Sequence, residues 1–295
     1  MADAARERSD SDPLAELLGE PRRRVVLAAP ADGQFTQVVR EGLAAAGWEV
    51  LLVHAAADAL GALDGAALLI LDTALADAQR VLREAKLNPD TNPIPAIAIF
   101  PRGNPPLRPT ELQIQADLEL TEPFVVHQLL TAAEREAARC AEAPALVRTV
   151  RLILPSSQAD LDQAAETAAR LLQESGLGEA DQASLIAAFR EAVGNAIQHG
   201  NLRDPAKCVR VEFRADAAAI TIEVRDEGPG FDHAHYLRLA RELDAAEAAR
   251  DRSRRGGLGG LGIPMLVRCT DRVEYNEQGN AVTLTKLLRP DATDA

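Results

Sequence analysis

One helix predicted from the sequence, residues 181–199, has two faces of different chemistry. Glu191, Asn195 and His199 recur at every fourth position, so they line one face of the helix. The apolar residues of the same segment line another face: Leu185, Phe189, Val193 and Ile197. One side of this helix is therefore expected to pack on a core, and the other to face a polar ligand.

The polar residues of this helix and of the segment that follows it are those that a nucleotide site requires. The amide oxygen of Asn195 is a hard ligand of the kind that Mg²⁺ prefers, and Glu191 is a candidate general base. Asp226 ends a predicted strand, where its carboxylate can accept a hydrogen bond from an exocyclic amine such as that of adenine. Gly228 and Gly230 allow the backbone to turn and to approach a flat ring.

A glycine-rich segment then leads into a second apolar helix, as expected of an anion-binding loop. Its glycines include Gly257, Gly259, Gly260 and Gly262. It lacks the Gly-Lys-Ser/Thr sequence of phosphate-binding loops and does not follow the strand-glycine-helix pattern of dinucleotide sites. Residues 235–250, rich in Ala, Arg and Glu, precede it and predict a lid.

Four motifs, in this order, resemble the boxes of the GHKL ATPase superfamily, and their spacing is most similar to the anti-sigma-factor serine kinase branch. They are Glu191-x-x-x-Asn195, Asp226-x-Gly228-x-Gly230, Gly260-x-Gly262 and Thr283. The resemblance spans about residues 147–288 and implies an α+β domain, an α/β sandwich that binds ATP and Mg²⁺. It implies Glu191 as the base, Asn195 as the magnesium ligand and Asp226 as the adenine acceptor. The implied nucleotide contacts are Asn195, His199, Asp226, Gly228, Gly230, Gly257, Gly259, Gly260, Leu261, Gly262 and Thr283.

Each motif also has an ordinary explanation when it is taken alone. The polar positions of the helix could be a solvated face, the Asp226 motif could be a turn, and the later glycines could be a linker. All three occurring together in the family's order favours a single nucleotide site.

The N-terminal half alternates short apolar runs with amphipathic segments, which predicts an α/β domain with a doubly wound parallel sheet. The expected helices lie at residues 36–46, 57–63, 76–86, 111–115 and 125–139. Residues 23–139 resemble a response-regulator receiver domain, with Asp72 at the phosphoacceptor position. The metal-binding acidic pair is replaced by Ala29-Pro30, and Glu122 stands where the family has a lysine. We therefore predict a degenerate receiver that does not switch by phosphorylation of Asp72.

These patterns divide the chain into two domains, and its composition limits the partners. The predicted parts are a disordered tail (1–21), the receiver-like domain (22–140), a linker (141–146) and the ATP-binding kinase domain (147–290). A net charge of -13 argues against nucleic acid or an anionic membrane as the main partner. With no signal peptide or apolar spanning segment, and with scattered cysteines, the sequence predicts a cytoplasmic protein.

The function predicted from the sequence is that of a bacterial signalling protein. The resemblance implies a serine/threonine kinase that phosphorylates a small antagonist protein, binds a sigma-like factor and forms a homodimer. Two alternatives stay open at this point. One is an ATP-sensing scaffold without turnover, because a fold does not guarantee chemistry. The other is a histidine-kinase-like two-component protein.

Overall fold

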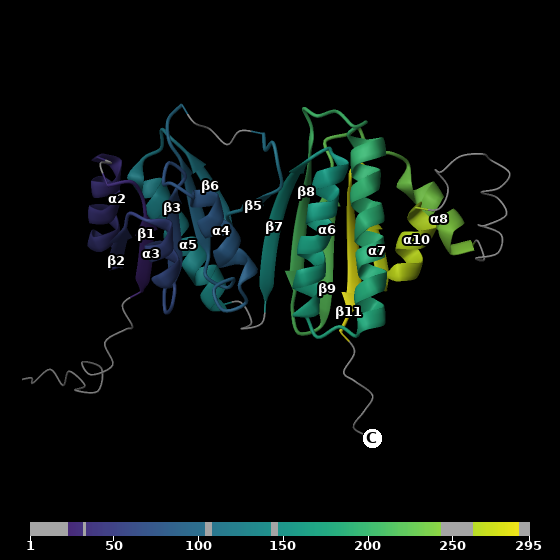
Figure 1. Ribbon diagram of the computed structural model, residues 1–295, viewed down its shortest axis with the longest axis horizontal. Coiled ribbons are helices and arrows are strands. Elements are labelled where there is room, and N and C mark those ends of the chain that lie inside the picture. Colours follow the sequence, from purple (N-terminus) through teal and green to yellow (C-terminus); the bar gives the residue numbers. More distant parts are fainter. Residues whose placement is uncertain (1–22, 32–33, 104–107, 143–146, 243–261, 289–295) are drawn as a thin grey trace, which may run out of the picture.

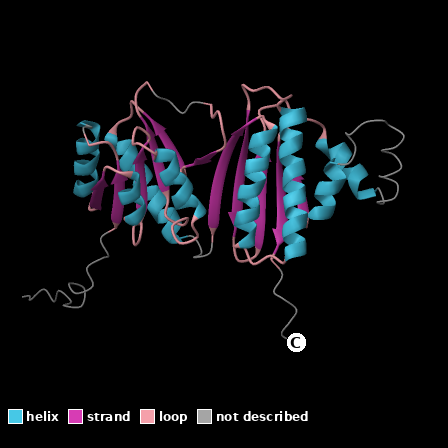
Figure 2. Cartoon of the chain, viewed as in Figure 1, coloured by secondary structure: helices cyan, strands magenta, loops and turns pink. Residues whose placement is uncertain are grey.

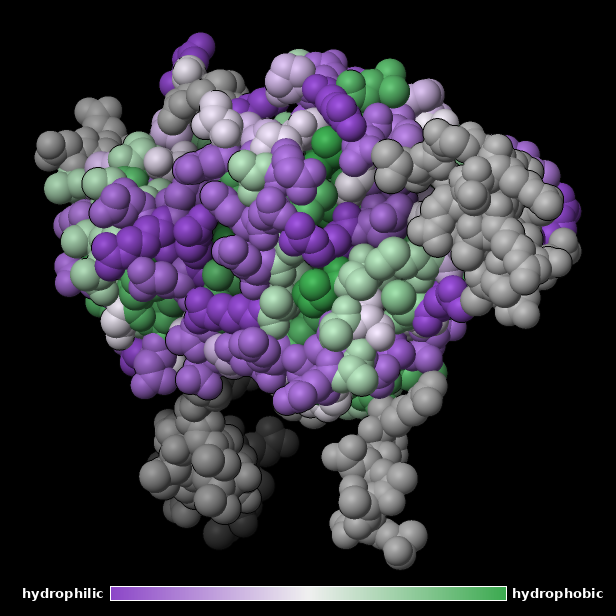
Figure 3. Space-filling view, turned by 45° about the vertical axis from the view of Figure 1, so that its right-hand side comes forward, coloured by the Kyte–Doolittle hydropathy of each residue, from purple (hydrophilic) through white to green (hydrophobic). Residues whose placement is uncertain are grey.

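The computed structural model describes residues 23–31, 34–103, 108–142, 147–242 and 262–288. Two sheets, each with its own helices, lie next to each other (Figures 1 and 2). The predicted tail (1–21) and the last four residues of the predicted linker (143–146) fall outside the described residues. None of the described helices is long and apolar enough to cross a membrane. The face seen in Figure 3 is mostly hydrophilic, with apolar side chains in separate patches.

The N-terminal sheet is parallel and has the order β2-β1-β3-β4-β6. This is the 2-1-3-4-5 order of doubly wound folds such as CheY, and it confirms the predicted fold class. The first, third and fourth strands are buried nearly throughout, as expected for a sheet covered on both faces. The strands are β1 (Arg24–Ala28), β2 (Glu49–Val53), β3 (Leu68–Asp72), β4 (Ala96–Phe100) and β6 (Leu118–Thr121).

Helices cover both faces of this sheet. One apolar cluster joins the sheet to α2 and α5, and another joins it to α3 and α4. Their bounds are α2 (Gln34–Ala45), α3 (Ala56–Gly61), α4 (Ala78–Leu87) and α5 (Val126–Glu142).

The C-terminal sheet is antiparallel and has the order β10-β11-β9-β8-β7-β5. Its alternating apolar residues pack against α6 and α7 on one face, and its other face carries charged and polar side chains. The strands are β5 (Gln113–Gln115), β7 (Arg148–Pro155), β8 (Cys208–Ala215), β9 (Ala219–Arg225), β10 (Arg272–Tyr275) and β11 (Ala281–Leu287). The helices are α6 (Gln158–Gln173), α7 (Glu179–Asn195), α8 (His233–Glu242) and α10 (Gly262–Cys269).

Strand β5 contradicts the helix predicted at residues 111–115. It crosses from the receiver-like domain and pairs antiparallel with β7, with Ile114 opposite Leu152 (Figure 1). Leu112 and Ile114 are 5% and 2% exposed and belong to the core of the C-terminal domain. Apolar residues at alternate positions have the period of a strand, and they bury one side of β5 in this core. The helix that would follow β4 in a regular receiver-like fold is therefore replaced by a strand of the other sheet.

Polar contacts also join the two domains. Lys86 of α4 forms a buried ion pair with Asp117, and Arg151 of β7 reaches the same carboxylate at 3.1 Å. Asn92 bonds the backbone of Thr149 in both directions, accepting at 3.1 Å and donating at 2.9 Å. Because these groups are buried and satisfied across the boundary, they hold the domains in one arrangement.

Candidate functional site

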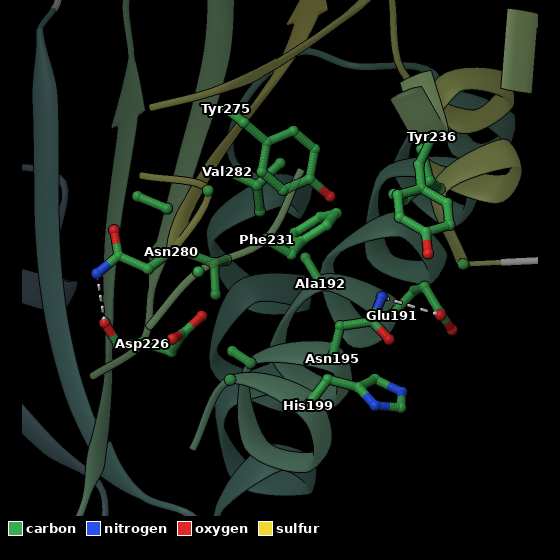
Figure 4. A pocket seen from close by; sticks show the side chains of 18 residues that line it. Glu191, Ala192, Asn195, His199, Asp226, Phe231, Tyr236, Tyr275, Asn280 and Val282 are labelled. Atoms are coloured by element: carbon green, nitrogen blue, oxygen red, sulfur yellow. Dashed lines mark hydrogen bonds between the residues drawn. The ribbon is translucent and has the colours of Figure 1, made fainter. Parts of the chain in front are cut away.

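A pocket of about 290 Å³ opens between α7 and the sheet of the C-terminal domain. Figure 4 shows Glu191, Asn195 and His199 side by side along the helix, with Asp226 facing them from the end of β9. The helix continues past Asn195 through a wider π-helical turn (Ala196–Gly200), which includes His199. The structure thus brings residues from distant parts of the sequence together around one cavity.

At one end of the pocket, Glu191 and Asn195 are bonded to each other. The amide nitrogen of Asn195 donates to Glu191 Oε1 at 3.1 Å, which leaves the amide oxygen of Asn195 free to bind a cation. The first residue of α10, Gly262, lies against the same pair, because a Cβ there would come within 2.3 Å of Glu191 Oε1. A side chain at this position would have to displace the Glu191 carboxylate or the Asn195 amide, so glycine lets the start of this helix approach the pair.

At the other end, the carboxylate of Asp226 is held by its own loop. The backbone N–H of Gly228 donates to Asp226 Oδ1 at 2.7 Å. Gly200 and Gly228 have no room for a side chain, because a Cβ on Gly200 would lie 2.2 Å from Asp226 Cγ, and one on Gly228 would lie 2.3 Å from Gly200 O. Gly200 and Gly228 therefore bring segments of the chain together, and Gly230 lines the pocket, where its approach to a ligand ring stays a prediction.

Comparison with known proteins agrees with this geometry. Residues 154–286 match a model of the histidine kinase-like ATPase domain. The C-terminal half of the chain contains a histidine kinase-like ATPase domain. This confirms the resemblance to the GHKL superfamily, whereas membership of the anti-sigma branch stays a prediction. No curated protein matches the chain in sequence.

The N-terminal half is similar to several solved structures. A response regulator from Chloroflexus aurantiacus is 20% identical, with 40% of this chain and 100% of that chain covered and a TM-score of 0.35. The receiver domain of a sensor histidine kinase from Pseudomonas aeruginosa is 18% identical, with 40% and 99% covered and a TM-score of 0.33. A receiver domain from Methanospirillum hungatei is 16% identical, with 41% and 98% covered and a TM-score of 0.33.

The donors of the ATPase domain fit Mg²⁺ that arrives together with a nucleotide. Among the described residues, no group of three or more His, Cys, Asp or Glu side chains is placed to hold a metal ion. Asn195 presents an amide oxygen at the pocket, and Mg²⁺ usually combines one or two protein ligands with phosphate oxygens and water. The residues present therefore fit a magnesium–nucleotide complex better than a metal bound by protein alone.

Not every predicted contact lines the pocket of the ATPase domain. Thr283 pairs with Glu223 and Glu274 within the sheet and is not among the lining residues, because its strand neighbours Val282 and Leu284 face the helices. Gly228 lies behind Asp226, outside the lining. The remaining predicted contacts, Gly257, Gly259, Gly260 and Leu261, lie outside the described residues, as does the second half of the predicted lid (243–250).

The pocket has an aromatic wall that no sequence motif indicated. Phe231, Tyr236 and Tyr275 line it (Figure 4), and Phe231 contacts both tyrosines at centroid distances of 5.8 and 5.3 Å. The chain has only two tyrosines, and both line this cavity. The scarcity of aromatic residues was the signal that could have pointed to them.

We expect nucleoside binding to weaken as the pH falls. Burial raises the pKa of the Asp226 carboxyl, and the Gly228 N–H, Lys207 and Arg225 oppose this only in part. The predicted acceptor of the adenine amine is the charged form of Asp226, so we expect full affinity above this raised pKa and a loss of about tenfold per pH unit below it. Titration with adenosine at descending pH measures this without interference from phosphate ionisation. Affinity that stays constant down to the usual aspartate pKa would argue against contact with Asp226.

The receiver-like domain is expected to remain unphosphorylated. Burial raises the pKa of Asp72, and the charge of Glu122 raises it further. A phosphoryl group on Asp72 would add negative charge beside Glu122 without the lysine that usually neutralises it. Mass spectrometry after incubation with acetyl phosphate should therefore find no modification. Label retained by the wild type and lost in Asp72→Ala would show a working receiver.

Proposed function

We propose that the protein is a Mg²⁺- and ATP-dependent serine/threonine kinase that phosphorylates a small antagonist protein and also binds a sigma-like factor. The observation that supports this most is the pairing of Glu191 with Asn195 at one end of the pocket, opposite Asp226. The general base and the cation ligand at one end of the pocket suit the triphosphate of ATP. The carboxylate at the other end suits its adenine. We further propose that the protein works as a homodimer in the cytoplasm.

Each side chain has a separate role in this reaction. Asp226 accepts from the adenine amine and fixes the nucleotide in the pocket. Glu191 accepts the proton of the attacking hydroxyl, and its bond to Asn195 holds its carboxylate in place. Mg²⁺, when bound with ATP, would neutralise phosphate charge beside the amide oxygen of Asn195. Positioning and charge neutralisation account for most of the catalysis in phosphoryl transfer.

As the acceptor of the phosphoryl group, a hydroxyl on another protein is favoured over a histidine of this chain. α5 ends at Glu142 and β7 begins at Arg148, so there is no room between the domains for the helical hairpin that carries the phosphoacceptor of ordinary histidine kinases. His127 lies on α5 of the receiver-like domain, and it is followed by Gln128 where such a kinase has an acidic neighbour.

The test is transfer of label from radiolabelled ATP to separate small proteins of the source cell, with wild type and Glu191→Ala side by side. The proposal expects acid-stable label on another protein, and none with the variant. Acid-labile label would instead indicate a phosphohistidine and a two-component role.

The second candidate is an ATP-sensing scaffold, and one contact favours it. Arg108, which precedes β5 in the crossover from the receiver-like domain, pairs with Glu227 at 3.1 Å, directly beside Asp226. Nucleotide at Asp226 could then alter the surface where the domains meet, without turnover. Binding of ATP together with a partner, but without any transfer of label, would favour this function.

A further inference from the structure

We propose that Tyr275 is a nucleotide-contacting residue whose hydroxyl donates a hydrogen bond to a phosphate oxygen at the Glu191 end of the pocket. This inference rests on the proposed function and adds a residue to its site. Neither the four sequence motifs nor the match to the ATPase family singles this tyrosine out.

The position of Tyr275 is set by the sheet. It is the last residue of β10, opposite Val282 of β11, and both residues line the pocket. Its ring is partly buried against the core of the ATPase domain. The strand pairing therefore places the ring at the cavity wall.

Two aromatic contacts fix the direction of the ring. Tyr275 stacks on His233, with centroids 5.3 Å apart and an interplanar angle of 22°. Phe231 meets the same ring edge-on, at 5.3 Å and 84°. Because these contacts restrict the rotation of the side chain, a hydrogen bond from its hydroxyl would cost little conformational entropy.

The hydroxyl lies on the pocket side of the ring. Figure 4 shows it pointing into the cavity among Phe231, Tyr236 and Glu191. No group within the described ranges accepts a hydrogen bond from it, and it is open to the pocket, because it is not among the fully buried side-chain atoms that lack a partner. A ligand oxygen in the pocket can take the place of water as its acceptor.

The charge state of this hydroxyl suits a phosphate acceptor. Burial, with a smaller effect from the charge of Glu191, raises the pKa of Tyr275 to about 12. The hydroxyl is therefore protonated and neutral at physiological pH. A neutral donor can lie beside the Glu191 carboxylate and still donate to an anionic oxygen, and hydrogen bonds to charged groups are stronger than neutral ones.

The ordinary explanation is that Tyr275 only fills the edge of the core. The two explanations differ in what the hydroxyl does, because a phenylalanine would keep the ring, its stacking and its burial. Tyr275→Phe in the full-length protein therefore separates them, and its melting temperature reports whether the fold is kept.

The experiment is calorimetric titration of wild type and Tyr275→Phe with Mg²⁺-ATP and, separately, with adenosine. We expect ATP affinity to fall by about 10- to 100-fold, as for loss of one hydrogen bond to a charged group. Adenosine has no phosphate for the Tyr275 hydroxyl to contact, so its affinity should change by less than about twofold. Equal ATP affinity in the two proteins would overturn the role of Tyr275 but leave the proposed function standing. A wild type that binds no ATP would overturn both.

A second measurement does not depend on a variant of Tyr275. With two tyrosines in the chain, fluorotyrosine labelling gives two resonances, which Tyr236→Phe assigns. The Tyr275 resonance should shift more with ATP than with adenosine. Equal shifts with both ligands would show that the phosphates do not reach the hydroxyl.

Discussion

Replacing Glu191 with glutamine is expected to abolish phosphoryl transfer while ATP binding is retained. Glutamine keeps an oxygen that can accept from the Asn195 amide, 3.1 Å away in the wild type, so the geometry of the pair is preserved. It cannot take a proton from the attacking hydroxyl, and loss of a general base typically costs about 10²- to 10⁴-fold in rate. The measurement is the rate of ATP turnover, with affinity followed by calorimetry.

Glu223→Gln is the matched control for this prediction. Glu223 lies in the same domain on β9, pairs with Arg225 and does not line the pocket, so its loss should leave turnover unchanged. A Glu191→Gln protein that turns over ATP at the wild-type rate would rule out Glu191 as the base. Loss of ATP affinity together with turnover would assign Glu191 to binding instead.

Replacing Ile114 with aspartate is expected to unfold the ATPase domain, although Ile114 lies within the sequence of the receiver-like domain. Ile114 is 2% exposed, lies opposite Leu152 and belongs to the core of the C-terminal domain. The change removes a large apolar side chain and buries a carboxylate there, and truncation of such a residue alone costs about 2–5 kcal/mol. That is a large part of the stability of an ordinary domain. Chemical denaturation with ATP binding as the second readout measures the effect.

Gln113→Asp provides the control on the same strand. Gln113 is partly exposed and points to the opposite face of the sheet, so the same charge there should cost far less. If Ile114→Asp unfolds no more readily than Gln113→Asp, β5 contributes nothing to the ATPase core. Truncation upstream of residue 147 should also destabilise this domain, because it removes Leu112 and Ile114.

The sequence predicted most of the fold because its periodicities are long. The strands and helices of both domains recur close to their expected positions, and helix α7 has the predicted apolar and polar faces. The segment at residues 111–115 has only two apolar positions, which are too few to separate a strand from a helical turn, and its partner strand begins more than thirty residues later, at Arg148. Which strand fills the edge of the sheet is decided by tertiary packing, so local sequence could not show it.

The site was predictable only where a motif carried the chemistry. Glu191, Asn195, His199 and Asp226 meet around one pocket, as their motifs indicated. Tyr275 belongs to no motif and reaches the pocket through the pairing of β10 with β11. Thr283 was assigned from the resemblance alone, and the alternation of side chains along β11 places it away from the cavity.

The most direct test of the nucleotide site is calorimetric titration of the full-length protein with ATP and Mg²⁺, beside an Asp226→Asn variant. Asparagine preserves the size of the side chain but replaces one acceptor oxygen with a donor, so it opposes the adenine amine. We expect saturable binding by the wild type and loss of binding in the variant. A folded wild type that binds no ATP would contradict this expectation and leave an interaction module without nucleotide chemistry.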